Sequence, residues 1–201
     1  MRILLSNDDG IDSPGLAALR AAVNDLGAVT VVAPSSPQSA AGHAITVHQP
    51  LEVRRIKVGP EEFLGISVDG RPADCVRLAI RTLLPEPPDL VLSGINEGAN
   101  VGINVFYSGT VAAAAEGAMF GIPAVAFSAG NAGGVNFPQV ARLCRKVLNQ
   151  LLRDGLTRGD LINVNIPVLK EGVPKGIRVV PQSTAGMEDF YEAIYHHGRE
   201  T

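Results

Sequence analysis

Two neighbouring carboxylates, Asp8 and Asp9, stand near the start of the chain, within the Ser-Asn-Asp-Asp-Gly segment at 6–10 and directly after the apolar run at 3–5. Adjacent carboxylates at the end of a hydrophobic run repel each other unless a positive charge lies between them or water solvates them. A divalent cation would supply that charge. The alternative is that one carboxylate caps the following turn and the other is solvated, so this acidic pair is not specific by itself.

Two later segments add polar side chains of the same chemical kind. Residues 34–49 are rich in hydroxyls and small side chains and include Ser39 and His43. Residues 94–104 carry a glycine at every fourth position, with asparagines between them, among them Asn96 and Asn100. This spacing favours a loop that approaches a ligand over glycines that only interrupt regular structure. It matches neither a dinucleotide fingerprint nor a phosphate-binding P-loop, because no Gly-Lys-Ser/Thr follows.

The sequence Ser108-Gly109-Thr110 precedes a run of very small residues that predicts a helix over 111–118. A helix start with two hydroxyls and unpaired backbone N–H groups suits an anion. An ordinary serine or threonine N-cap explains the same residues equally well.

Carboxylates, a hydroxyl and asparagine amides together form a set of oxygen ligands. Hard oxygen donors suit Mg²⁺, Mn²⁺ or Ca²⁺ better than zinc or copper. A cation beside an anion-binding helix start indicates a phosphorylated substrate, because the cation polarises phosphoryl oxygens while N–H groups hold the remaining charge. Hydrolysis of a phosphate ester is therefore the expected reaction.

The elements around these residues predict a parallel sheet. Residues 2–6 form a strand, Ser13 and Pro14 begin a helix that ends before Gly27, and residues 28–33 form a second strand without polar alternation. Open α/β sheets bind ligands at the carboxyl ends of their strands, so the acidic pair and the 34–49 loop are expected at one edge. Further strands are predicted at 51–58, 62–68, 89–93, 124–128, 161–166 and 177–180, and further helices after Gly70 and over 140–151.

The predicted fold is thus α/β: a Rossmann-like three-layer αβα arrangement with a mostly parallel sheet, a β-hairpin excursion at 51–68 and a C-terminal extension. With 201 residues, one domain over 1–183 is expected, followed by a tail at 184–201. The net charge of −3 disfavours binding to nucleic-acid polymers or anionic membranes. The N-terminal apolar run is too short for a signal peptide and no apolar run is long enough to span a bilayer, so the cytoplasm is the expected compartment. Cys75 and Cys144 are expected to be reduced core thiols.

Four segments closely resemble the SurE family of survival-protein nucleotidases. They are residues 6–16, 33–43, 93–100 and 107–113, which occur in the family's order within roughly the first 165 residues. The resemblance implies a metal-dependent phosphatase that releases phosphate from nucleoside 5′- and 3′-monophosphates, with short polyphosphate as a further substrate. It implies one divalent cation per subunit, Mg²⁺ or Mn²⁺, held by Asp8, Asp9, Ser39 and Asn96.

The resemblance also places Ser108, Gly109 and Thr110 beside the substrate phosphate, which favours the anion site over the plain helix cap. Asn100 and His43 fall in matching segments and are candidate substrate-binding residues. For His43, a hydrogen bond that orders its loop is an alternative to proton transfer. The expected catalytic residues are Asp8, Asp9 and Ser108, with a cation-activated water as the attacking group and Ser108 as an alternative covalent nucleophile.

The C-terminal part departs from the family. Its members usually continue into a longer segment that forms a hairpin exchanged between subunits, building dimers and tetramers, whereas this sequence stops at Thr201. The tail is therefore truncated or divergent, and a homodimer or homotetramer is an expectation from the family alone. A nucleotide-binding sensor with negligible turnover is the alternative function.

Overall fold

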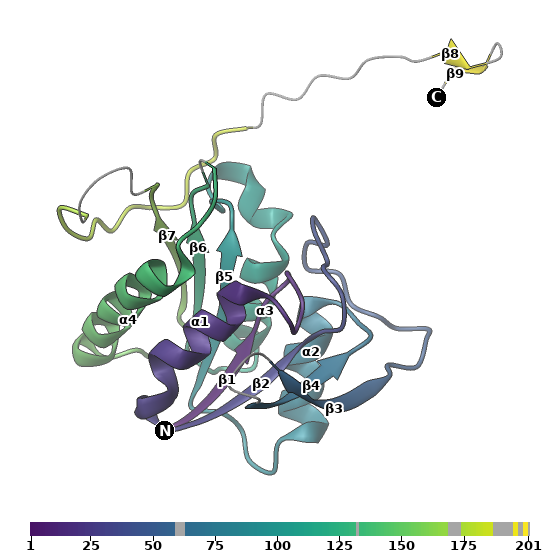
Figure 1. The fold of residues 1–201 in the computed structure, drawn as a ribbon, viewed down its shortest axis with the longest axis horizontal. Coiled ribbons are helices and arrows are strands. Elements are labelled where there is room, and N and C mark those ends of the chain that lie inside the picture. The colour runs from purple at the N-terminus through teal and green to yellow at the C-terminus, as the bar shows by residue number, and fades with distance from the viewer. Residues whose placement is uncertain (59–62, 132, 169–173, 187–194, 197–198, 201) are drawn as a thin grey trace.

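A computed structural model describes residues 1–58, 63–131, 133–168, 174–186, 195–196 and 199–200. Within these residues, the chain forms a seven-stranded sheet in the order β3-β4-β2-β1-β5-β6-β7 (Figure 1). All neighbouring strands are parallel except β3 and β4, which are antiparallel. The strands are β1 (Arg2–Ser6), β2 (Ala28–Pro34), β3 (Val53–Val58), β4 (Phe63–Val68), β5 (Leu90–Glu97), β6 (Ala124–Ala129) and β7 (Leu161–Ile166).

Helices cover both faces of this sheet (Figure 1). Helices α1 (Pro14–Val23) and α4 (Phe137–Asp154) pack with one hydrophobic core, and α2 (Pro72–Leu78) and α3 (Gly109–Met119) pack with a second core on the opposite face. Shorter helical turns are η1 (Asn24–Leu26), η2 (Ala79–Leu83) and η3 (Gly102–Phe106). The predicted three-layer, mostly parallel α/β fold is confirmed, and the hairpin excursion joins the sheet as its β3 edge.

Local sequence signals explain the first strand-helix-strand unit. The Ser13 hydroxyl accepts a hydrogen bond from the Leu16 N–H at 3.2 Å, and Pro14 occupies the first turn of α1. Proline there costs no intrahelical hydrogen bond, and its fixed φ suits the helix. The apolar residues of β1 and β2 that face the cores are buried, as expected for strands covered on both sides.

The glycine-rich stretch differs from its prediction. Strand β5 continues through Asn96 and Glu97, with a register irregularity between Ser93 and Asn96, so the loop does not begin at Gly94. A Cβ atom at Gly94 would lie 2.3 Å from the Phe127 carbonyl oxygen. Gly94 is therefore required for close approach of β5 to β6, and here the structural explanation that the sequence analysis disfavoured is correct.

The strand predicted at 177–180 is wrong. These residues pair with no strand in the described part of the chain, and the side chains of Ile177, Val179 and Val180 are 62%, 94% and 63% exposed. An apolar β-branched run forms a strand only where a partner offers hydrogen bonds, and no described strand offers them to this run.

The tail prediction for 184–201 falls largely outside the described residues. Of that segment, Tyr195–His196 (β8) and Arg199–Glu200 (β9) form an antiparallel pair. The division into one domain at 1–183 and a tail stays a prediction.

Both cysteines are free and buried, which confirms the expected core thiols. Burial raises the pKa of the Cys144 thiol to about 12, and it also raises the pKa of Cys75, so both remain protonated near neutral pH. Within the described residues, no helix combines the length and the apolar character needed to cross a membrane.

Candidate active site

The acidic pair lies at the carboxyl end of β1, where three segments meet. The Thr110 hydroxyl, in the first turn of α3, donates a hydrogen bond to Asp8 Oδ1. The Gln38 N–H, in the loop after β2, donates to the Asp8 carbonyl oxygen at 2.8 Å. Asp8 is only 8% exposed, so the end of β1, the loop and the start of α3 enclose it.

Gly109 allows α3 to approach Asp8 this closely. A Cβ atom added at Gly109 would lie 2.7 Å from Asp8 Cβ and 3.0 Å from Pro72 Cγ. Neither atom is the free end of a flexible side chain. The absence of a side chain at this position is therefore part of the site's geometry.

The acidic pair carries charge that the described protein groups do not neutralise. Burial raises the pKa of Asp8 above its usual value, against the opposing effect of hydrogen bonds from Thr110. Burial, followed by the nearby charges of Asp8 and Glu97, raises the pKa of Asp9 to about 6. No lysine or arginine forms an ion pair with either carboxylate in the described residues.

These features fit a divalent cation. A cation between the carboxylates would offset their repulsion, which adds to the effect of burial in raising the pKa of Asp9. The described residues contain no group of three or more His, Cys, Asp and Glu side chains arranged to hold a metal. Neutral oxygens such as those of a serine, an asparagine or water would complete a set of hard ligands of the kind that suits Mg²⁺ or Mn²⁺.

Asn96 and Ser39 carry neutral oxygens in segments at or after the ends of strands at the same edge of the sheet. Asn96 lies near the end of β5, which pairs directly with β1, and its side-chain N–H donates to the Gly98 carbonyl at 2.7 Å. This hydrogen bond leaves the Asn96 amide oxygen available as a ligand. Ser39 is exposed and follows Gln38, the residue that binds the Asp8 carbonyl.

Ser108 is the N-cap of α3. Its hydroxyl accepts a hydrogen bond from the Val111 N–H at 3.1 Å, so the plain helix cap is present. A capping serine retains its own O–H donor, which is compatible with a nearby anion. In the described part of the chain, no histidine or carboxylate accepts a hydrogen bond from Ser108, as an activating base would.

Asn100 is fixed by strands β6 and β7. Its backbone N–H donates to Asn165 Oδ1 at 2.8 Å, and its carbonyl oxygen accepts from the side chains of Asn163 and Asn165 at 2.8 and 3.0 Å. Its side-chain N–H donates to the Ser128 hydroxyl at 2.8 Å. This network holds the loop after β5 against the edge of the sheet.

His43 forms the loop-ordering contact. Its Nε2 lies 2.8 Å from Glu116 Oε2, and the other carboxylate oxygen of Glu116 accepts from Arg77 at 2.6 Å. Glu116 lies within α3, six residues beyond Thr110. The structure thus shows the hydrogen bond that was an alternative for His43, and among the described residues the ring has no hydrogen bond to Ser108.

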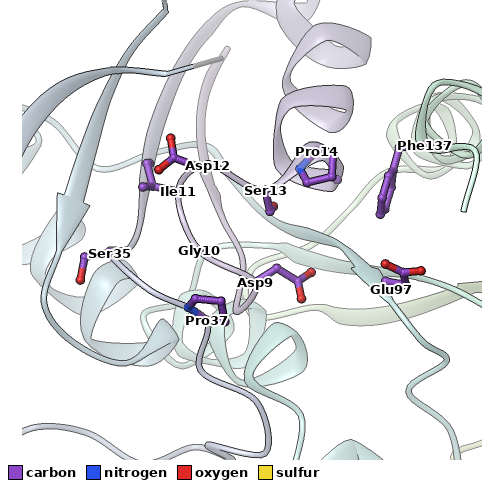
Figure 2. Close-up of a pocket in the computed structure, with 11 residues that line it drawn as sticks. Asp9, Gly10, Ile11, Asp12, Ser13, Pro14, Ser35, Pro37, Glu97 and Phe137 are labelled. Carbon is purple, nitrogen blue, oxygen red and sulfur yellow. The ribbon is translucent and has the colours of Figure 1, made fainter. Parts of the chain in front are cut away.

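Sequence reasoning missed two acidic residues near this site, Glu97 and Glu116. Glu97 lies across from Asp9 on a cavity of about 350 Å³ that opens between the starts of α1 and α4 (Figure 2). Figure 2 shows the Asp9 side chain directed toward Glu97, with Phe137 nearby. Both acids belong to sequence segments that were already of interest. Their neighbours, Asp9 for Glu97 and His43 for Glu116, become apparent only in the folded structure.

Comparison with known proteins bears directly on this geometry. The sequence profile described as "Survival protein SurE" matches residues 3–189. The chain belongs to the SurE family. A relative named 5′-nucleotidase SurE from Desulforudis audaxviator (strain MP104C) is 47% identical over 182 residues, which cover 89% of this chain and 70% of the relative. The protein of the same name from Aquifex aeolicus (strain VF5) is 44% identical over 195 residues, 96% of this chain and 75% of that protein.

Solved structures agree with the SurE assignment. The crystal structure of the SurE protein from Aquifex aeolicus superposes with a TM-score of 0.80 at 45% identity, over 91% of this chain and 73% of that chain. The family predicted from the four sequence segments is therefore confirmed.

Proposed function

We propose that this SurE-family chain is a divalent-metal-dependent phosphomonoesterase that hydrolyses nucleoside 5′- and 3′-monophosphates to nucleoside and phosphate. The observation that carries the proposal is the uncompensated acidic pair, bound by Thr110 at the start of α3. The relatives named 5′-nucleotidase SurE support the substrate class. Short polyphosphate is proposed as a further substrate.

Electrostatics explains why the cation and the helix start are needed together. A phosphate group near Asp8, Asp9 and Glu97 would meet three carboxylates and be repelled. The partial positive charge at the start of α3 is too small to offset that repulsion alone. A cation held by Asp8, Asp9, Ser39 and Asn96 would reverse the sign of the local charge and let the phosphate approach.

Each group then has a defined task. When bound, the cation would polarise a phosphoryl oxygen and make a water molecule more acidic. Ser108, through its O–H, and Gly109, through its N–H, hold the phosphate in line with the attacking water, while Thr110 fixes Asp8. Asn100 positions the loop beside the substrate. Ser108 as a covalent nucleophile is less well supported, because no described base contacts it.

Further parts of the proposal concern the cell and the assembly. We propose Mg²⁺ or Mn²⁺ as the cation, one per subunit, and the cytoplasm as the compartment, which the two free thiols support. We also propose a homodimer or homotetramer. The exposed apolar side chains of Ile177, Val179 and Val180 support association, since apolar patches of this kind commonly mark protein interfaces.

The test is phosphate release from 5′-AMP, 3′-AMP and tripolyphosphate, with Mg²⁺ or Mn²⁺ and then with excess chelator. Metal-dependent release from the nucleotides supports the proposal. Nucleotide binding without release would favour the sensor alternative instead.

A further inference from the structure

The loop after β2 carries Ser39, and several hydrogen bonds fix it to the rest of the protein. Its Gln38 N–H donates to the Asp8 carbonyl at 2.8 Å, and its Gly42 N–H donates to the Tyr107 carbonyl at 3.0 Å. Further along, Thr46 donates from its N–H and its hydroxyl to the two carboxylate oxygens of Asp74, at 2.8 and 2.7 Å. Ser39 thus lies between the first two of these contacts.

The side chain that holds the middle of this loop is His43, and its partner is Glu116. The Glu116 side chain is 4% exposed, whereas those of His43 and Arg77 are 31% and 49% exposed. A buried carboxylate inside a helix of small residues is unfavourable unless both oxygens are bound. Here one oxygen binds Arg77 on α2 and the other binds His43 on the loop.

Helix α3 therefore contacts the proposed site through its first turn and the 38–46 loop through Glu116. Its first turn presents Ser108 and Thr110, the latter bound to Asp8. Glu116 stands six residues beyond Thr110, about 9 Å along the helix axis at the usual rise per residue. A contact between α2 and α3 alone would require only Arg77, so the second oxygen of Glu116 has a separate role at the loop.

From this arrangement we infer that Glu116 is a positioning residue. Acting through His43, it holds the 38–46 loop so that Ser39 faces the acidic pair and completes the cation site. The inference rests on the proposed function, because it assigns Ser39 to that site. Partners that orient metal ligands from the outer shell commonly change metal affinity when they are removed.

The test measures Mn²⁺ binding to metal-free protein by electron paramagnetic resonance, without substrate. We expect His43→Ala and Glu116→Gln each to weaken Mn²⁺ binding by about tenfold or more. The double variant should bind no more weakly than the weaker single variant, since both changes remove one contact. His43→Gln, whose amide can still donate to Glu116, should recover part of the affinity.

The matched control is His48→Ala, because His48 is exposed on the same connection, five residues beyond His43. It should bind Mn²⁺ as the unmodified protein does. A second readout needs no metal: amide hydrogen exchange over residues 38–46 should accelerate in His43→Ala while exchange in α3 stays unchanged. His43 is at the surface, so this variant remains informative even if Glu116→Gln does not fold.

Three results would overturn the inference. The first is that both single variants bind Mn²⁺ as tightly as the unmodified protein. The second is that the losses of Mn²⁺ affinity add in the double variant. The third is that the single variants melt at a lower temperature but bind Mn²⁺ unchanged. Absence of Mn²⁺ binding by the unmodified protein would overturn it together with the cation site. Mn²⁺ binding that responds as expected, but without phosphate release, would overturn the proposed function alone.

Discussion

Asp9, a candidate cation ligand, lowers the stability of the metal-free protein near neutral pH. Burial of its carboxyl group raises its pKa to about 6, and the nearby charges of Asp8 and Glu97 act in the same direction. In the unfolded chain the pKa returns to the ordinary value of 3.8. The folded protein therefore binds a proton at Asp9 more tightly than the unfolded chain does, and the metal-free protein loses stability as the pH rises from about 4 to about 6.

We expect Asp9→Asn to stabilise the metal-free protein at pH 7. The gain should be about 1 to 2 kcal/mol, after allowance for the solvent that screens a partly exposed group. The advantage should shrink toward pH 4, where the Asp9 carboxyl of the unmodified protein becomes neutral. Urea unfolding with chelator present, at both pH values, measures this difference. A variant that is less stable at pH 7 would contradict the electrostatic account of the acidic pair.

Gly109 tests the steric part of the site. Alanine at this position would place its Cβ 2.7 Å from Asp8 Cβ. The displacement of Asp8 should lower kcat/KM for 5′-AMP by about a hundredfold, the usual consequence of a misplacement near 1 Å. Steady-state phosphate release measures it.

Gly176→Ala is the control for that substitution, because no atom lies within 4 Å of a Cβ there. This control should retain full activity. Equal activity of both variants would show that the contact between Gly109 and Asp8 is not critical.

At the scale of elements, the site depends on how the loops after β2 and β5 are fastened to neighbouring strands. The asparagine network of β7 fastens the second loop: Asn165 both accepts from the Asn100 N–H and donates to its carbonyl. Asn163 donates to that carbonyl only. The two side chains therefore make unequal contributions to the same loop.

Asn165→Ala should accordingly reduce the free energy of unfolding by about 1 to 3 kcal/mol, because it leaves a buried N–H without a partner. It should also raise KM for 5′-AMP, since Asn100 would no longer be fixed. Asn163→Ala, which removes one of two donors to the carbonyl, should have the smaller effect on both quantities. The reverse order in urea unfolding and steady-state kinetics would contradict this assignment.

The elements themselves were largely predictable, for local reasons. Ser13 followed by Pro14 specifies the start of α1, and unbroken β-branched runs specify buried parallel strands. Glu116 could not be predicted, because its partners His43 and Arg77 stand 73 and 39 residues away in the sequence. Gly94 was misread for a similar reason, since the need for glycine arises from Phe127 on the neighbouring strand.

At the scale of the whole molecule, the sheet topology brings the site together. Strands β1 and β5 are adjacent at the centre of the sheet, so the acidic pair and Asn96 reach the same edge although 87 residues separate Asp9 from Asn96. Helix α3 follows β5 and adds Ser108 to Thr110 at that edge. The sequence segments that resemble the SurE family are those that the fold places at the ends of these elements.

The most direct test of the metal-dependent nucleotidase is phosphate release from 5′-AMP in the presence of Mn²⁺, comparing the unmodified protein with Asp8→Asn. Asp154→Asn, the same chemical change at the exposed end of α4, is the control. We predict that the unmodified protein releases phosphate and that chelator abolishes this release. Asp8→Asn should lower the rate of release by at least about a hundredfold, in line with removal of a group that acts directly on the reaction. Asp154→Asn should retain full activity. Release by the unmodified protein that persists in chelator, or that Asp8→Asn leaves unchanged, would contradict the account.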